Sequence, residues 1–188
     1  MNFTEFAVPE LKNHLYLEGM PQRWWKAQLV SFMFRPNKHT FISSLLPSIT
    51  EIFGTRLAAN EPLWPEKLLF TFMREGDKGS EAPLHAPEEY WSTIVRLSER
   101  HKIRHVYVSS DSGLAIEKLL ELSSSYTPDL KIYFLDYHRL PSGMGQEYLK
   151  KNVWGKPVVT RMVHVALTDA LIASRAIAWV GTLSSKYV

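Results

Sequence analysis

The chain has 188 residues, which is enough for one domain with a hydrophobic core, or for one domain and part of another. Its 45% hydrophobic and 12% aromatic content excludes an intrinsically disordered protein. The net charge of +3 arises from scattered Lys and Arg residues, so no nucleic-acid partner is expected, and the lack of cysteine excludes disulfides and Cys-ligated metal.

The sequence predicts a helical segment at residues 1–60. Apolar residues recur at helical spacing within residues 22–34, and a second helix is expected from about Thr40 to Phe53. Gly54 closes this helix, since glycine readily adopts the left-handed conformation of a helix cap. Two prolines between Ala58 and Pro65 mark the expected domain boundary.

From residue 66 onward, strand and helix patterns alternate. Four strands are expected, at 67–73, 103–108, 132–135 and 177–182. The intervening helices are expected at 87–101, around the inner-face residues Ile116, Leu119 and Leu120, and at 158–175. This alternation predicts an α/β fold with a Rossmann-like parallel sheet and right-handed crossovers, formed by a domain of residues 66–188.

The loop after the first expected strand is the most informative one, because two glycines and five charged residues directly follow a buried apolar run. Ligands of open α/β sheets bind beyond the carboxyl ends of the strands, so the loops after the first, second and fourth strands are expected to share one ligand-binding edge. The polar side chains expected there are Arg74, Asp77, Lys78, Glu81, Asp111, Ser184 and Ser185. The sequence holds neither a dinucleotide fingerprint nor a P-loop, and this mixture of groups favours a phosphate-bearing donor that meets a nucleophile.

An ordered series of short motifs covers residues 23 to 188. The series consists of Trp24-Trp25-x-x-Gln28, Arg35-Pro36, Arg74-x-x-Asp77-Lys78-x-x-Glu81-Ala82-x-x-His85-x-x-Glu88-Glu89-Tyr90, Tyr107-Val108-Ser109-Ser110-Asp111, Asp169 and Val180-x-Thr182-x-Ser184-Ser185. In order and spacing it resembles the α-1,6-fucosyltransferases that core-fucosylate N-glycans. The resemblance implies the nucleotide-sugar-binding half of a GT-B-like glycosyltransferase, with residues 1–60 as part of the first catalytic half and with the second domain truncated at its C-terminus.

The resemblance implies a donor site for GDP-β-L-fucose. Arg74 matches the arginine that holds the donor's β-phosphate, a task suited to a guanidinium fork. Asp169 matches the carboxylate that reads the guanine edge, and Ser185, next to Ser184, matches the serine at the donor phosphates. No metal and no cofactor is implied.

The resemblance also implies an acceptor site for an N-glycan. Glu81 matches the base that deprotonates the acceptor hydroxyl, with Lys78 assisting, and Asp77 supports the acceptor. Further supporting positions are matched by Tyr90, Asp111 and His85. The implied reaction inverts the anomeric centre and fucosylates a glycan hydroxyl, expected to be the 6-OH of the innermost GlcNAc. The implied compartment is the Golgi lumen. No apolar run approaches the roughly 18 residues of a membrane helix, so no membrane contact is expected from this segment.

Plainer interpretations of these residues remain open. Arg74 with Asp77, and Lys78 with Glu81, are also compatible with ion pairs of a solvated loop. Asp169 is the only acid in the apolar stretch 158–180, and its alternative is an internal partner such as Arg161 or Arg175. Ser184 and Ser185 are also compatible with a helix cap. Asp77, Glu81 and Asp111 are also compatible with a site for a hard metal ion.

Four positions depart from the family pattern. Glu75 replaces a second arginine, Phe72 a histidine, Ser112 the second of two aspartates and Lys186 a neutral amide. The departures at Glu75 and Phe72 affect the expected donor binding. The departure at Ser112 affects the expected choice of acceptor. Two other functions therefore stay open: a non-catalytic nucleotide- or glycan-binding module derived from this fold, and a related protein O-fucosyltransferase.

Overall fold

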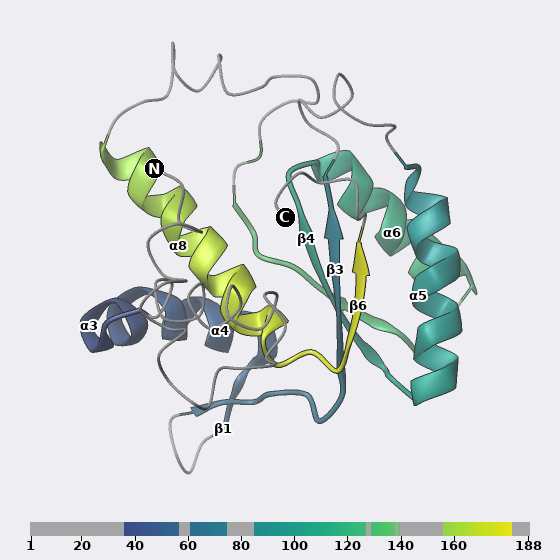
Figure 1. The fold of residues 1–188 in the computed structure, drawn as a ribbon, viewed down its shortest axis with the longest axis horizontal. Helices are drawn as coiled ribbons and strands as arrows, with labels where there is room; N and C mark the ends of the chain where they lie inside the picture. Colours follow the sequence, from purple (N-terminus) through teal and green to yellow (C-terminus); the bar gives the residue numbers. More distant parts are fainter. Residues whose placement is uncertain are drawn as a thin grey trace, which may run out of the picture. The chain divides into compact units, whose positions relative to one another are not determined.

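The computed structural model describes residues 36–56, 61–74, 85–126, 129–137, 139 and 156–181 (Figure 1). The chain divides into two units, Met1–Asn37 and Lys38–Val188, and nearly all described residues belong to the second. The helix predicted at 22–34 lies outside the described residues.

The second unit is built on a four-stranded sheet whose strands are all parallel. The central strands are β3 (Leu68–Met73) and β4 (His105–Ser110), with β5 (Lys131–Tyr133) beside β4 and β6 (Ala178–Gly181) beside β3. Counted in chain order, these strands have the order 3-2-1-4, which confirms the predicted Rossmann-like α/β fold. The chain crosses back over the sheet between β5 and β6, so a topological switch point lies between the carboxyl ends of β3 and β6.

Helices cover both faces of the sheet. In Figure 1, α5 (Pro87–His101) and α6 (Gly113–Tyr126) lie on one side, and α4 (Leu46–Phe53) and α8 (Lys156–Ala173) on the other. The first core contains Leu69, Met73, Trp91, Ile94, Val106, Val108, Ile116, Leu119 and Val180. The second core contains Ile49, Phe53, Leu68, Phe70, Tyr107, Ile172 and Ala173. Because successive strand residues point to opposite faces, strands buried on both faces need the continuous apolar runs that the sequence shows.

The helical region before the sheet belongs to the same unit as the sheet. It comprises α3 (Lys38–Thr40), a π-helical turn η1 (Phe41–Leu45) and α4, which ends at Gly54 as predicted. The backbone of Gly54 has a positive φ of 83°, but with ψ of 178° it does not adopt the left-handed helical conformation that was expected. The short antiparallel strands β1 (Thr55–Arg56) and β2 (Glu61–Pro62) follow. The division at 37/38 therefore differs from the boundary expected between Ala58 and Pro65. The physical reason is that α4 buries its apolar side in the second core, which a change of composition at the prolines does not reveal.

All four predicted strands, and the helices predicted at 87–101 and 158–175, agree with the structure to within two residues. β4 continues to Ser110 because Ser109 and Ser110 remain paired with β3, so these serines are strand residues and not loop residues. The expectation for Leu120 was wrong: it is 38% exposed, whereas Ile116 and Leu119 are buried. Leu120 follows the buried Leu119, and the rotation of about 100° between neighbouring helix residues takes its side chain away from the buried side of α6.

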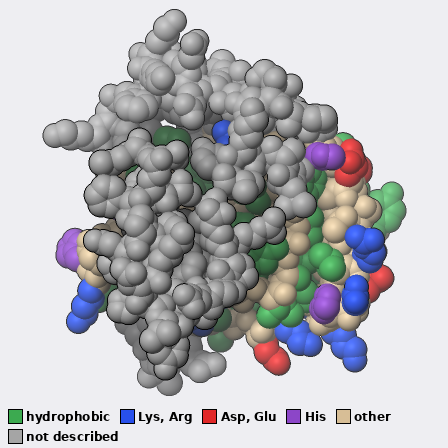
Figure 2. All heavy atoms as spheres, viewed as in Figure 1, with side chains coloured by type: hydrophobic (Ala, Val, Ile, Leu, Met, Phe, Trp, Pro, Cys, Tyr) green, Lys and Arg blue, Asp and Glu red, His purple; other side chains and the backbone are tan. Residues whose placement is uncertain are grey.

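Cationic and anionic side chains are interspersed on the described part of the surface that Figure 2 shows, without a large patch of one sign there. In the described part of the chain, no helix combines the length and the apolar character that crossing a bilayer requires.

Helix α5 contains a buried hydroxyl group without a hydrogen-bond partner among the described residues. The side chain of Ser98 is buried against the sheet, and its Oγ has no hydrogen-bond partner among the described residues. Burial of an unsatisfied hydroxyl costs about 1–3 kcal/mol. Ser92, in the same helix, is exposed and donates its hydroxyl to the carbonyl of Glu89 at 2.8 Å.

We predict that Ser98→Ala increases the free energy of unfolding by about 1 kcal/mol, because it removes the unsatisfied hydroxyl and introduces a better helix former. Urea titration followed by circular dichroism measures the change. Ser92→Ala is the control, because it makes the same substitution where the hydroxyl is satisfied and exposed. A Ser98→Ala variant that is no more stable than Ser92→Ala would contradict the prediction.

Candidate functional site

The carboxyl edge of the sheet is the candidate site, because every strand of this parallel sheet ends there. Arg74 directly follows β3 and Asp111 directly follows β4, and both side chains are half-buried. The structure thus brings two of the predicted site residues to one edge, on adjacent strands. The remaining residues predicted for this edge lie outside the described residues: Asp77, Lys78, Glu81, Ser184 and Ser185.

Asp169 lies on the side of α8 that faces the sheet. Its Oδ1 accepts a hydrogen bond from Tyr107 Oη at 2.5 Å, and its Oδ2 accepts one from Ser109 Oγ at 2.6 Å. Tyr107 and Ser109 are two residues apart in β4, so the strand periodicity directs both hydroxyls to this face. The carboxylate therefore connects α8 to the carboxyl half of β4.

Burial dominates the electrostatics of this cluster. It raises the pKa of Asp169 above its ordinary value, although the hydrogen bonds from Ser109 and Tyr107 and the charge of Arg139 act in the opposite direction. Burial also raises the pKa of Tyr107, and the charge of Asp169 adds to that rise. The Tyr107 hydroxyl therefore stays protonated and remains a donor.

The internal partners of Asp169 are these two hydroxyls, not the arginines weighed in the sequence analysis. The guanidinium of Arg175 lies 5.0 Å from the centre of the Trp64 ring instead. Each carboxylate oxygen of Asp169 has a further lone pair beyond the one that accepts the hydroxyl hydrogen. Recognition of a guanine edge by Asp169 stays a prediction.

A second polar cluster caps the carboxyl end of β4, and the sequence analysis did not predict it. Arg139 donates to the carbonyls of Ser110 at 3.1 Å, Tyr137 at 3.2 Å and Leu135 at 2.6 Å. Its guanidinium also lies 4.2 Å from the centre of the Tyr137 ring, and Tyr137 Oη donates to the Ser110 carbonyl at 3.0 Å. The aromatic and basic residues after β5, Tyr137 and Arg139, were the feature of the sequence that could have indicated this cluster. Their target, however, is a backbone carbonyl about 30 residues earlier in the chain, which has no sequence signature.

The departure at Ser112 has a structural role. Ser112 is buried, its N–H donates to Ser110 Oγ at 3.1 Å, and its Oγ accepts the N–H of Ala115 at 3.2 Å, as an N-cap of α6 does. A serine here caps the helix as an aspartate would, but it carries no charge.

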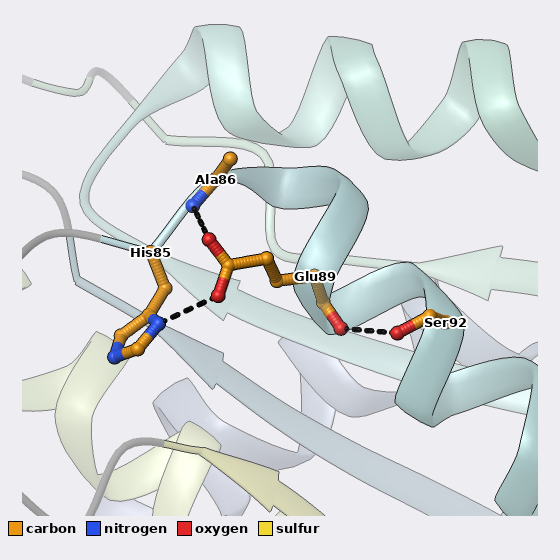
Figure 3. Close-up of polar contacts among 4 residues, drawn as sticks. All are labelled: His85, Ala86, Glu89 and Ser92. Carbon is orange, nitrogen blue, oxygen red and sulfur yellow. Dashed lines mark hydrogen bonds and ion pairs between the residues drawn. The ribbon is translucent and has the colours of Figure 1, made fainter.

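Two predicted supporting residues lie at the start of α5: His85 directly precedes the N-cap Ala86 (Figure 3), and Tyr90 is in the first turn of the helix. Glu89 contacts the chain before the helix twice, accepting the N–H of Ala86 at Oε1 over 3.3 Å and contacting Nδ1 of His85 with Oε2 over 2.8 Å. The Tyr90 ring is buried and meets the His85 ring edge-on, with ring centres 6.4 Å apart. The hydrogen bond with His85, followed by that with Ala86, lowers the pKa of the Glu89 carboxyl.

Among the described residues, no group of three His, Asp or Glu side chains is placed to hold a metal ion. Comparison with known proteins gives no match, either to a protein-family model or to a curated protein. The fucosyltransferase resemblance therefore depends on the motifs alone.

We predict that Asp169→Asn changes the pH dependence of stability. An acid whose pKa is raised by folding loses its proton more readily in the unfolded state, so the wild-type free energy of unfolding falls as the pH rises from the ordinary aspartate pKa, about 4, through the raised value. Asparagine has no such titration, so the variant gains stability relative to the wild type across that interval.

Urea unfolding at a series of pH values measures this difference. Asp129→Asn, in the exposed turn before β5, controls for the loss of a negative charge. A difference between Asp169→Asn and wild type that stays constant with pH, or that shifts toward the wild type as the pH rises, would show that burial does not dominate at Asp169.

Proposed function

We propose that this chain binds GDP-β-L-fucose at the carboxyl edge of its sheet and transfers fucose to a glycan hydroxyl, the 6-OH of the innermost GlcNAc of an N-glycan. The observation that carries the proposal is the place of Arg74, which directly follows β3 at the switch point between β3 and β6. Open α/β folds bind ligands at such a point, and an arginine fork fits a phosphate. The ordered motifs add the identity of the donor and acceptor.

In the proposed donor site, Arg74 grips the β-phosphate in a bidentate contact, and Ser184 and Ser185 after β6 supply hydroxyls to the phosphates. Asp169 accepts hydrogen bonds from the guanine edge. Its carboxylate is oriented in advance by Tyr107 and Ser109, which supports a binding role because little conformational freedom is lost when the ligand arrives.

In the proposed reaction, Glu81 accepts the proton of the acceptor hydroxyl as its oxygen forms a bond to the anomeric carbon of fucose. The bond from that carbon to the phosphate oxygen breaks, GDP leaves, and the configuration inverts. Arg74 and Lys78 offset the negative charge that develops on GDP, so the transfer needs no metal. Asp77, Asp111 and Tyr90 support the acceptor side, and we propose the Golgi lumen as the compartment.

A non-catalytic binding module is the second candidate function, and the observation that favours it is Phe72. This side chain is 38% exposed near the end of β3, where the family has a polar histidine. Release of GDP from GDP-fucose in the presence of a defined N-glycan distinguishes a transferase from a binding module. Acceptor profiling with folded protein domains distinguishes the N-glycan enzyme from a protein O-fucosyltransferase.

We predict that Arg74→Ala weakens GDP binding by about 10- to 100-fold, the range expected for a hydrogen-bonded contact between charged groups. Arg74→Lys restores little of this loss, since lysine keeps the charge but lacks the fork. Calorimetric titration with GDP measures both. Arg104→Ala is the matched control, because Arg104 precedes β4 and so lies at the opposite edge of the sheet. Unchanged GDP affinity in Arg74→Ala would remove the donor site from this edge.

We predict that Glu81→Gln lowers kcat for fucose transfer by about 10²- to 10⁴-fold, the usual contribution of general-base catalysis, with GDP affinity nearly unchanged. Glutamine keeps the shape of glutamate but does not accept the proton. Steady-state kinetics with GDP-fucose and an N-glycan acceptor measure the effect. If the acceptor KM rises while kcat stays intact, Glu81 positions the sugar and another group takes the proton.

A further inference from the structure

Glu89 makes a set of contacts that the proposed roles leave unused. Its side chain lies in the first turn of α5, which begins in the connection that leaves β3, so Glu89 lies near the carboxyl edge of the sheet (Figure 1). One carboxylate oxygen accepts the backbone N–H of Ala86, and the other contacts the imidazole of His85 (Figure 3). The carboxylate therefore connects the helix start to the histidine ring.

The geometry of Glu89 is fixed at its backbone as well. Its N–H donates to the carbonyl of Ala86 at 3.0 Å, and its carbonyl accepts the Ser92 hydroxyl at 2.8 Å. The pKa of its carboxyl is lowered, first by the hydrogen bond with His85, so the group is ionised at neutral pH. Glu89 thus places an ionised carboxylate beside Nδ1 of His85, although 61% of the Glu89 side chain is exposed.

An ionised carboxylate only accepts hydrogen bonds, so the hydrogen between Oε2 and Nδ1 belongs to the histidine. A neutral imidazole carries one ring hydrogen, which leaves a lone pair on Nε2. In Figure 3 this second ring nitrogen lies on the side of the ring away from Glu89, and it makes no hydrogen bond within the described part of the chain. The His85 side chain is 43% exposed, so a ligand can reach it, and the Tyr90 ring lies edge-on to its ring.

We propose that Glu89 is a positioning residue that fixes His85 in the Nδ1–H tautomer, so that Nε2 accepts a hydrogen bond from a hydroxyl group of the acceptor sugar. The identity of the ligand rests on the proposed function, whereas the tautomer rests on the contacts of Glu89 alone. The pair works as a carboxylate–histidine unit that sets the direction of one hydrogen bond, and no proton or covalent bond is exchanged.

Glu89→Gln tests the proposal with little disturbance of the helix. Glutamine keeps an oxygen for the Ala86 N–H, but its amide N–H₂ faces Nδ1 and donates to it, which moves the ring hydrogen to Nε2. The ¹⁵N chemical shifts of the two ring nitrogens, assigned by their loss in His85→Asn, report the tautomer in the full chain. We expect Nδ1–H in the wild type and Nε2–H in Glu89→Gln.

The GlcNAc disaccharide N,N′-diacetylchitobiose is the ligand probe. We expect it to shift the Nε2 resonance of the wild type, and we expect Glu89→Gln to bind it about ten-fold more weakly, because Nε2–H of the variant cannot accept the hydroxyl hydrogen and the hydroxyl has to reverse its hydrogen bond. Glu88→Gln is the matched control, because it removes the neighbouring charge of the same turn, whose oxygen lies 4.0 Å from Lys118 Nζ. This variant should keep both the tautomer and the affinity.

Nε2–H in the wild type would overturn the proposal, as would an unchanged tautomer in Glu89→Gln. Unchanged disaccharide affinity in Glu89→Gln, or no binding to the wild type, would overturn the assignment of the sugar ligand. Fucose transfer is measured separately. A chain that binds the disaccharide through His85 but transfers no fucose supports this inference and contradicts the proposed function.

Discussion

The parallel pairing of β3 with β4 on one side and β6 on the other is the constraint on which the rest of the structure depends. A parallel sheet has to be covered on both faces, because strands joined by crossover helices bury both sets of side chains. The two cores meet this requirement, one under α5 and α6 and the other under α4 and α8. The same pairing aligns the strand ends, so that Arg74 and Asp111 follow adjacent strands.

The second core becomes polar toward the carboxyl end of β4. Along β4, the face toward α8 changes from the aromatic ring of Tyr107 to the hydroxyl of Ser109, and Asp169 accepts hydrogen bonds from both residues. A buried carboxylate without partners would be costly, and the two hydroxyls offset part of that cost without neutralising the charge. Burial nevertheless raises the pKa of Asp169 above its ordinary value.

The candidate site combines a rigid part and a locally organised part. The rigid part consists of the strand ends and of α8, where Asp169 is held by hydrogen bonds from β4. The organised part is the start of α5, where Glu89 connects Ala86 and His85. Backbone carbonyls at the end of β4 are occupied by Arg139 and Tyr137. Among the described residues, Glu89, Asp169 and Arg139 are therefore oriented by contacts within the fold before any ligand binds.

The sequence by itself determined the order of the sheet strands and of the helices between them, since apolar runs and helical spacing place the four strands β3 to β6 and the helices α5 and α8 within two residues. It also determined that Arg74 and Asp111 follow strands of one parallel sheet, because alternation of strand and helix admits few other arrangements. Only the tertiary structure decided that α4 joins the sheet, that Asp169 faces Tyr107 and Ser109 in place of an arginine, and that Arg139 caps β4. The hydrogen bonds among these contacts join residues as much as 62 positions apart, and burial selects among their possible partners. Local periodicity carries no information about that choice, because it depends on which faces meet when the chain packs.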